Sequence, residues 1–260
     1  MRIDIDALFD AYLNDFIEKN GDVLSPTEIE KRISILYEEF GNIPCKELGG
    51  HTPIEYLKTM PTEELIECFK EGIEEGESAS DYVCKALETR IDAEEELLKM
   101  ALGEDEELSI CSINVLANMG AEKSLKRFVD VLNSKKIPTT VCDVMTEALC
   151  SNADLIKEDV LKVYNPNGPG AESFEEVLSN MSKDERVFKL LYASFLNNKS
   201  NLAINASYLA KYGDDRALTV LYSTIKRNDI SIIEYSEIKN AIEKLGGEVE
   251  DDGRFVRNTH

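Results

Sequence analysis

Residues 205–221 read NASYLAKYGDDRALTVL, which contains the end of one predicted helix, a turn and the start of another. Apolar residues spaced three or four apart predict a helix up to Tyr212, and Gly213 is typical of a helix C-terminus. Asp214 then supplies an N-cap, whose side chain can accept a hydrogen bond from a free backbone N–H group. The stretch therefore predicts two helices joined by a sharp turn.

The same pattern recurs along the chain at an interval of about 30 residues. DERVFKLLYASF at 184–195 matches DDRALTVLYSTI at 214–225, and AEKSLKRFVDVL at 121–132 keeps the apolar positions. One leucine or isoleucine near the end of every second predicted helix marks the period, at intervals of 29, 33, 29, 31 and 33 residues. Such a period indicates stacked helical pairs, because one pair cannot bury its apolar side alone. These anchor residues are Leu87, Leu116, Leu149, Leu178, Leu209 and Ile242.

The repeated unit resembles that of the HEAT-like (armadillo-type) helical repeat superfamily over residues 79–247. Besides the stretch quoted first, the best matches are SINVLANMGAEKSL at 112–125 and NAIEKLGGE at 240–248. The resemblance implies an all-α fold, a right-handed α-solenoid of about five to six helical pairs whose second helices line the concave side. The sequence departs from the pattern at Ala153 and Ser182, where the family has glycine.

The sequence predicts three regions: an N-terminal helical domain at 1–75, the repeat solenoid at 76–247 and a C-terminal tail at 248–260. Four short helices are expected in the first region. Ser25-Pro26-Thr27-Glu28 and Thr52-Pro53-Ile54-Glu55 are capping-box sequences that open two of them, the first running to Gly41. Residues 62–75 are expected to supply a first A helix. The other first (A) helices are expected near 92–102, 121–133, 154–164, 185–197 and 214–227, and the second (B) helices near 79–90, 106–119, 138–152, 171–181, 201–212 and 233–246.

The composition excludes several classes of protein. The 260 residues are 43% apolar, which is too apolar for a disordered chain. There is no run of about 18 apolar residues, so we expect no membrane span. No secretory signal is visible at the start. The six cysteines lack the spacing of a zinc or redox motif, which favours reduced thiols that act as small core residues in a cytoplasmic protein.

Charge is divided unevenly along the chain, whose net charge is −22. Residues 1–107 carry −19, and residues 108–260 carry −3. We therefore expect a basic partner to prefer the N-terminal half. Nucleic acid is an unlikely ligand because phosphate contacts need clustered bases, and the local cluster of Lys123, Lys126 and Arg127 is small.

No catalytic constellation is visible. The sequence lacks a GxGxxG, P-loop or GxSxG motif, and His51 is the only histidine before the last residue. The acidic runs at 94–96 and 104–107 are interpreted as solvated faces or helix caps, with metal or basic-partner binding as the alternative. We therefore expect no catalytic residue, no metal and no cofactor.

The resemblance sharpens this expectation. The HEAT-like deoxyhypusine hydroxylases hold iron with His-Glu pairs, which this sequence lacks. The HEAT-like DNA glycosylases use a basic groove with aromatic residues, which this acidic, Trp-free chain does not suggest. The phycobilin lyase branch of this superfamily has no short sequence signature, so the sequence leaves that function open.

Two interaction features are predicted in the last repeats. Asp184 with Arg186, and Asp214 with Arg216, are interpreted as N-caps with ion pairs between repeats, the alternative being a ladder of surface contacts to a partner. The residues expected to bind a partner are Asn205, Tyr208 and Tyr212, because tyrosine on a concave B helix suits an interface.

The sequence thus favours a non-catalytic protein-protein interaction scaffold. The alternative is an enzyme or accessory factor of the lyase-type HEAT-like proteins, acting on a small molecule or a modified protein. A nucleic-acid-processing HEAT-like protein is the least favoured class.

Overall fold

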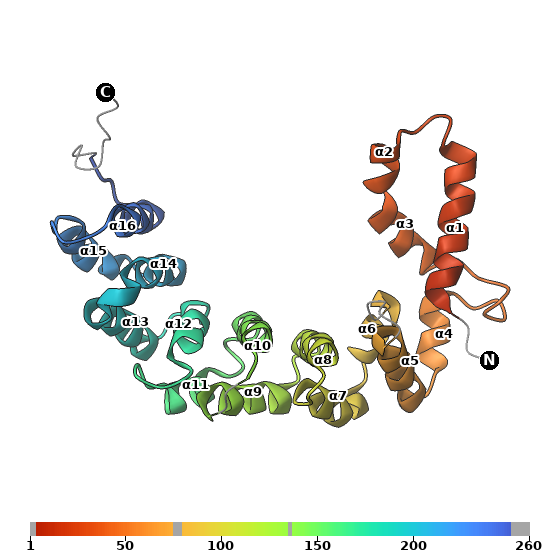
Figure 1. Cartoon of the computed structure of the whole chain (residues 1–260), viewed down its shortest axis with the longest axis horizontal. Helices are drawn as coiled ribbons and strands as arrows, with labels where there is room; N and C mark the ends of the chain where they lie inside the picture. Colours follow the sequence, from red (N-terminus) through yellow and green to blue (C-terminus); the bar gives the residue numbers. More distant parts are fainter. Residues whose placement is uncertain (1–3, 75–79, 135–136, 251–260) are drawn as a thin grey trace. The chain divides into compact units, whose positions relative to one another are not determined.

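The computed structural model describes residues 4–74, 80–134 and 137–250, and Figure 1 shows the chain. Within these ranges, all regular structure is helical: sixteen α-helices and three short 3₁₀ helices, with no strand. The predicted all-α fold is confirmed. The predicted boundary near residue 75 and tail residues 251–260 lie outside the described residues, so the three-region division stays a prediction.

The chain packs as two compact units, Met1–Ala121 and Glu122–His260. Residues 108–121 contain no Asp, Glu, Lys or Arg, so the formal charges of the two units are the −19 and −3 of the sequence halves. Each unit is described below by itself.

Unit 1 begins with helices that follow the capping signals of the sequence. Both capping boxes form: Glu55 accepts from the Thr52 backbone N–H at 3.0 Å, and Glu28 accepts from that of Ser25 at 2.9 Å. The single helix expected up to Gly41 is wrong, because the chain turns tightly where the Arg32 N–H bonds to Ile29 O, three residues back, at 2.8 Å. The helices of unit 1 are α1 (Ile5–Asn20), α2 (Pro26–Glu30), α3 (Ile33–Phe40), α4 (Pro53–Thr59), α5 (Thr62–Glu74), α6 (Asp81–Leu87), the 3₁₀ helix η1 (Ile91–Ala93), α7 (Glu94–Ala101) and α8 (Glu106–Asn118).

Unit 2 contains the remaining helices, and their bounds agree with the predicted A and B helices to within a few residues. Several of them start at an acidic or hydroxyl N-cap, such as Asp184, Asp214 and Ser231. The helices are α9 (Glu122–Ser134), α10 (Thr139–Ser151), α11 (Lys157–Val163), α12 (Ala171–Ser179), α13 (Glu185–Asn197), η2 (Lys199–Asn201), α14 (Leu202–Tyr212), η3 (Asp215–Ala217), α15 (Leu218–Ile225) and α16 (Ile232–Lys244).

The six anchor residues are among the most deeply buried side chains of their helices. Each lies at or near the C-terminal end of α6, α8, α10, α12, α14 or α16, and none is more than 1% exposed. The residue four positions before each anchor is also buried, as expected for one face of a helix. These residues are Val83, Ser112, Met145, Phe174, Asn205 and Ile238.

The cysteines differ from the expectation in one respect. All six are unbridged, but each is half-buried instead of lying inside the core. Their thiols therefore sit at the core boundary. Among the described residues, no helix has both the length and the apolar content to cross a membrane.

Candidate functional site

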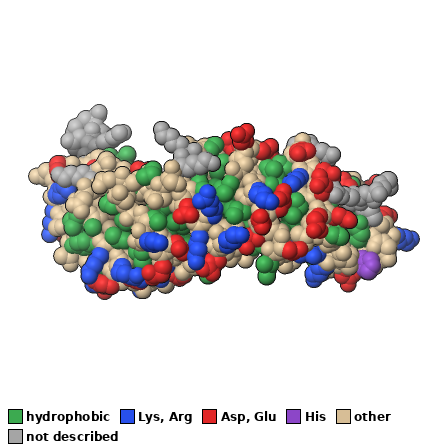
Figure 2. Space-filling model, turned by 90° about the horizontal axis from the view of Figure 1, so that it is seen from below, with side chains coloured by type: hydrophobic (Ala, Val, Ile, Leu, Met, Phe, Trp, Pro, Cys, Tyr) green, Lys and Arg blue, Asp and Glu red, His purple; other side chains and the backbone are tan. Residues whose placement is uncertain are grey.

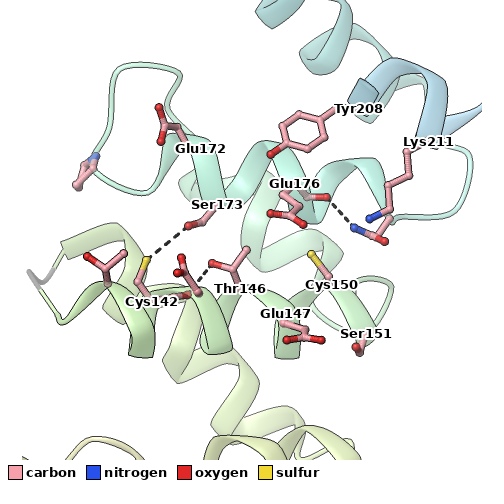
Figure 3. A pocket seen from close by; sticks show the side chains of 14 residues that line it. Cys142, Thr146, Glu147, Cys150, Ser151, Glu172, Ser173, Glu176, Tyr208 and Lys211 are labelled. Carbon is pink, nitrogen blue, oxygen red and sulfur yellow. Dashed lines mark hydrogen bonds between the residues drawn. The ribbon is translucent and has the colours of Figure 1, made fainter. Parts of the chain in front are cut away.

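A hollow of about 780 Å³ lies over α10, α12 and α14 of unit 2 (Figure 3). It is lined mainly by polar side chains, and we call it the acidic groove. The sequence predicts each of these three helices as the second of a helical pair. The lining residues are Thr139, Cys142, Asp143, Thr146, Glu147, Cys150, Ser151, Pro169, Glu172, Ser173, Glu176, Asn180, Tyr208 and Lys211.

Four carboxylates of the groove occupy equivalent positions on two successive helices. Asp143 and Glu147 lie six and two residues before the α10 anchor, and Glu172 and Glu176 lie six and two residues before the α12 anchor. Residues four apart share one helix face, so both pairs project toward the groove. Sequence reasoning missed this spacing because it considered only consecutive acidic residues.

These carboxylates are not neutralised by the protein. Glu172 accepts a hydrogen bond from the Asn201 amide at 3.0 Å. Within the part of the chain that the structure describes, none of the four forms an ion pair within 4.0 Å of a basic group, and Lys211, the basic residue of the lining, forms none either. With four carboxylates and one ammonium group, the hollow has a net formal charge of −3, and a hollow with a net charge concentrates the electric potential, which here attracts cations.

Some of the other polar groups of the groove bond to each other. Thr146 donates to the Cys142 carbonyl oxygen at 2.8 Å, and the Cys142 thiol lies 3.8 Å from the Ser173 hydroxyl. Burial raises the pKa of the Cys150 thiol to about 12. Because the thiolate is the nucleophile, Cys150 is inert at neutral pH.

Of the three residues predicted to bind a partner, Tyr208 lines the groove. Its hydroxyl points toward Glu176 in Figure 3. Burial, followed by the nearby charge of Glu176, raises the pKa of Tyr208 above its usual value. Tyr208 therefore keeps its proton and remains a hydrogen-bond donor.

The other two predicted residues lie elsewhere. Asn205 is 2% exposed, and its amide nitrogen and oxygen have no hydrogen-bond partner among the described residues. Tyr212 is buried, and its hydroxyl accepts from the Asp184 backbone N–H at 2.6 Å and donates to the Asp184 carbonyl at 3.0 Å. The Lys183 ammonium lies 4.3 Å from the centre of the Tyr212 ring. Tyr212 thus joins the end of α14 to the start of α13.

Ion pairs connect successive A helices of unit 2. Arg186 donates to Glu158 on α11 at 2.6 and 2.9 Å, and Arg216 donates to Glu185 on α13 at 2.8 Å. The Asp184 carboxylate accepts from the Arg186 backbone N–H at 2.8 Å, and Asp214 caps η3 in the same way. The predicted caps, and the predicted ion pairs from Arg186 and Arg216 to a preceding helix, are therefore confirmed. We call this set the arginine ladder.

The predicted basic cluster is largely compensated by acids. Lys126 pairs with Glu122 at 2.7 Å, and Arg127 pairs with Asp130 at 3.6 Å. Figure 2 views the molecule from the side on which α9 and α11 lie in Figure 1, and Lys and Arg side chains are mixed there with Asp and Glu side chains. This surface therefore offers no continuous basic patch for phosphate contacts.

The acidic runs of unit 1 have structural partners. Glu96 accepts from Lys70 and from Lys99, each at 3.2 Å, and Asp105 caps α8 by accepting from the Leu108 N–H at 2.9 Å. His51 is an exposed loop residue. In the described ranges, no group of three or more His, Cys, Asp or Glu side chains is placed to hold a metal ion.

Comparison of the sequence with models of known protein families gives no match, and comparison with curated proteins gives no significant match either.

Proposed function

We propose that this protein is a non-catalytic scaffold that binds a basic segment of another protein in the acidic groove. In this proposal, the helical pairs stack as a right-handed, HEAT-like solenoid with the B helices on the concave side. The observation that carries it is the set of four carboxylates at equivalent positions of α10 and α12, none with a basic partner within reach among the described residues.

Electrostatics supports a basic occupant. Like charges four residues apart on a helix destabilise it by about 0.2–0.5 kcal/mol per pair. Two such pairs face the same groove, so cationic side chains from a partner would relieve repulsion in both helices. The attraction would also accelerate association and weaken as salt is added.

The spacing of the helices suggests the pattern of the partner. Packed helices lie about 8–10 Å apart, and residues three apart in a polyproline II segment lie about 9 Å apart on the same face. A polyproline II segment with basic residues at i and i+3 can therefore place one cation over α10 and the next over α12. Tyr208 on α14 offers an aromatic face to a third side chain, which suits a further cation or an apolar group.

Other features agree with binding instead of chemistry. The groove has an inert thiol at Cys150, and its negative charge disfavours nucleic acid. The unbridged cysteines suit a reducing, cytoplasmic setting. The alternative function, an accessory factor that acts on a small molecule, is favoured by one specific observation, an apolar pocket in unit 1 lined by residues of α3, α4 and α6.

A peptide-binding experiment tests the proposal. The probe is a fluorescent 12-residue peptide with arginine at every third position, measured by fluorescence polarisation against the full chain. We expect Glu147→Gln with Glu176→Gln to weaken binding by about tenfold and to reduce its salt dependence, since each solvent-exposed charge contact is worth up to about 1 kcal/mol. Glu243→Gln, which removes an exposed charge outside the groove, is the matched control.

A further variant tests the expectation from the sequence that a basic partner prefers the N-terminal half. Glu63→Gln with Glu64→Gln removes two charges from α5 of unit 1. If this variant weakens the peptide more than the groove variant does, the N-terminal half is the binding region and the proposal for the groove is wrong. Equal affinity of all variants and the native chain would also refute it.

A further inference from the structure

Unit 1 contains a second pocket of different chemistry. A cavity of about 300 Å³ lies between the end of α3, helix α4 and helix α6. Its walls are mostly apolar and include Tyr37, Ile54, Leu57, Tyr82 and Ala86. Apolar cavities of this volume are at the small end of the range that holds small molecules.

The walls of this pocket are fixed by hydrogen bonds and close packing. The Tyr37 and Tyr82 rings stack with centres 4.2 Å apart. The Tyr37 hydroxyl donates to Asp6 at 3.2 Å, and the Tyr82 hydroxyl donates to the Tyr37 carbonyl oxygen. A Cβ atom at Gly41 would lie 2.8 Å from the Tyr82 ring, so only glycine permits this approach. The pocket is thus preorganised.

A distant arginine holds the end of α4 in place. The Arg90 guanidinium donates to the carbonyl oxygens of Lys58 and Met60 at 2.9 and 3.0 Å. These bonds satisfy carbonyl groups that a helix C-terminus leaves free. They also fix the backbone that carries Lys58 at the rim of the pocket.

Two lysines stand at the rim, although unit 1 is strongly acidic. Within the described ranges, neither Lys58 nor Lys85 lies within 4.0 Å of a carboxylate oxygen. Two of the neighbouring carboxylates accept hydrogen bonds from other donors: Glu55 accepts from the Thr52 N–H at 3.0 Å, and Glu88 accepts from the Asn118 amide at 2.7 Å. Both ammonium groups are therefore available to an anion.

The rest of the rim adds one opposing charge. Glu38 and Asn42 lie at the end of α3 and complete the lining. With two lysines and one glutamate, the rim has a formal charge of +1 in a unit that carries −19. Local charge at the pocket is thus opposite in sign to its surroundings.

We propose that this pocket binds a small amphiphilic carboxylate, with its apolar body against the tyrosines and its carboxylate at Lys58 and Lys85. This site goes beyond the proposed peptide groove and does not depend on it. A single carboxylate within a few ångströms of two ammonium groups feels their field directly, whereas charges more than about 10 Å away are screened at physiological salt. A long acidic peptide would instead meet the net negative charge of the unit.

The test is calorimetric titration of the full chain with 4-phenylbutyrate, a probe that has one aromatic ring and one carboxylate. We expect saturable binding of one molecule. The alcohol 4-phenylbutanol has the same apolar body without the charge, and we expect it to bind at least about tenfold more weakly, because hydrogen bonds to charged groups are worth about 1.5–3 kcal/mol.

Variants locate the site and separate it from the groove. Lys58→Gln with Lys85→Gln should weaken the probe about tenfold, Ala86→Leu should fill the cavity and abolish binding, and Lys46→Gln with Lys31→Gln is the charge-matched control. Melting temperatures show whether each variant is folded. No binding of 4-phenylbutyrate by the native chain, equal binding of the alcohol, or equal loss in the control would overturn the proposal. None of these results bears on the peptide groove.

Discussion

Replacement of Asn205 by leucine should stabilise the protein, although it removes a polar residue that sequence reasoning assigned to partner binding. Asn205 is 2% exposed on α14, and both polar atoms of its amide lack partners among the described residues. At the equivalent position of four other B helices, the chain has Val83, Met145, Phe174 and Ile238, and the fifth has Ser112. The site is therefore an apolar core position occupied by an amide.

The expected gain can be worked from three contributions. A buried amide without a partner costs about 1–3 kcal/mol in protein mutational data. Burial of a leucine side chain contributes about 1.5–3 kcal/mol relative to exposure. Imperfect fit of the new side chain costs about 1–3 kcal/mol. We expect Asn205→Leu to raise the free energy of unfolding by about 1–3 kcal/mol, or about 2 °C in melting temperature for each kcal/mol.

Urea denaturation followed by circular dichroism at 222 nm measures this change. Ser112→Ala is the matched control, because Ser112 has the equivalent position in α8 and its hydroxyl also lacks a partner among the described residues. Ser112→Ala should raise the free energy of unfolding by about 1 kcal/mol. If Asn205→Leu lowers the free energy of unfolding by more than about 1 kcal/mol, the Asn205 amide is paired in solution and the reasoning is wrong. Peptide affinity should not change, since Asn205 does not line the acidic groove.

Three further outcomes are expected. Tyr212→Phe leaves the Asp184 backbone N–H without its partner, so urea denaturation should show a free energy of unfolding that is lower by about 1–3 kcal/mol. Peptide affinity should not change, and weaker peptide binding would instead assign Tyr212 to the groove. Gly213 has φ +73°, so Gly213→Ala should cost about 1–2 kcal/mol in the same assay, and an unchanged midpoint would refute the left-handed cap. Hydrogen bonds from Arg186 hold the pKa of Asp184 at about 2, below its ordinary 3.8. The ionised Asp184 carboxylate therefore stabilises the fold fully above the pKa of Asp184 in the unfolded chain, and this stabilisation disappears as the pH falls from about 4 toward 2. Asp184→Asn should flatten the acid limb of a curve of stability against pH, and an unchanged limb would contradict this.

Local signals in the sequence predicted the elements well. Capping boxes at Ser25 and Thr52 and the αL glycine at 213 are short-range features, and the structure forms each of them. The break between α2 and α3 could not be predicted, because Lys31 and Arg32 are good helix formers and neither proline nor glycine interrupts the stretch.

The candidate sites were less predictable because they depend on residues of different helices that only the fold brings together. The acidic pairs of α10 and α12 were visible as a four-residue spacing, but their meaning required the two helices to lie side by side. Tyr208 and Tyr212 look alike in the sequence, yet one lines the groove and the other bonds to Asp184. The pocket in unit 1 joins three helices, and no local pattern marks it.

The arginine ladder also has a consequence for how such a chain can change in length. In each step of the arginine ladder, an arginine donates to a glutamate on the preceding A helix, and the glutamate beside that arginine accepts from the arginine of the next A helix. Glu185 and Arg186 supply this acceptor and this donor. A tandem duplication of residues 184–213, inserted after Gly213, would therefore bring its own donor and its own acceptor. Recombination could therefore add or remove whole segments of this length and leave every arginine of the ladder paired with a glutamate. An insertion of half this length would separate one arginine from its glutamate.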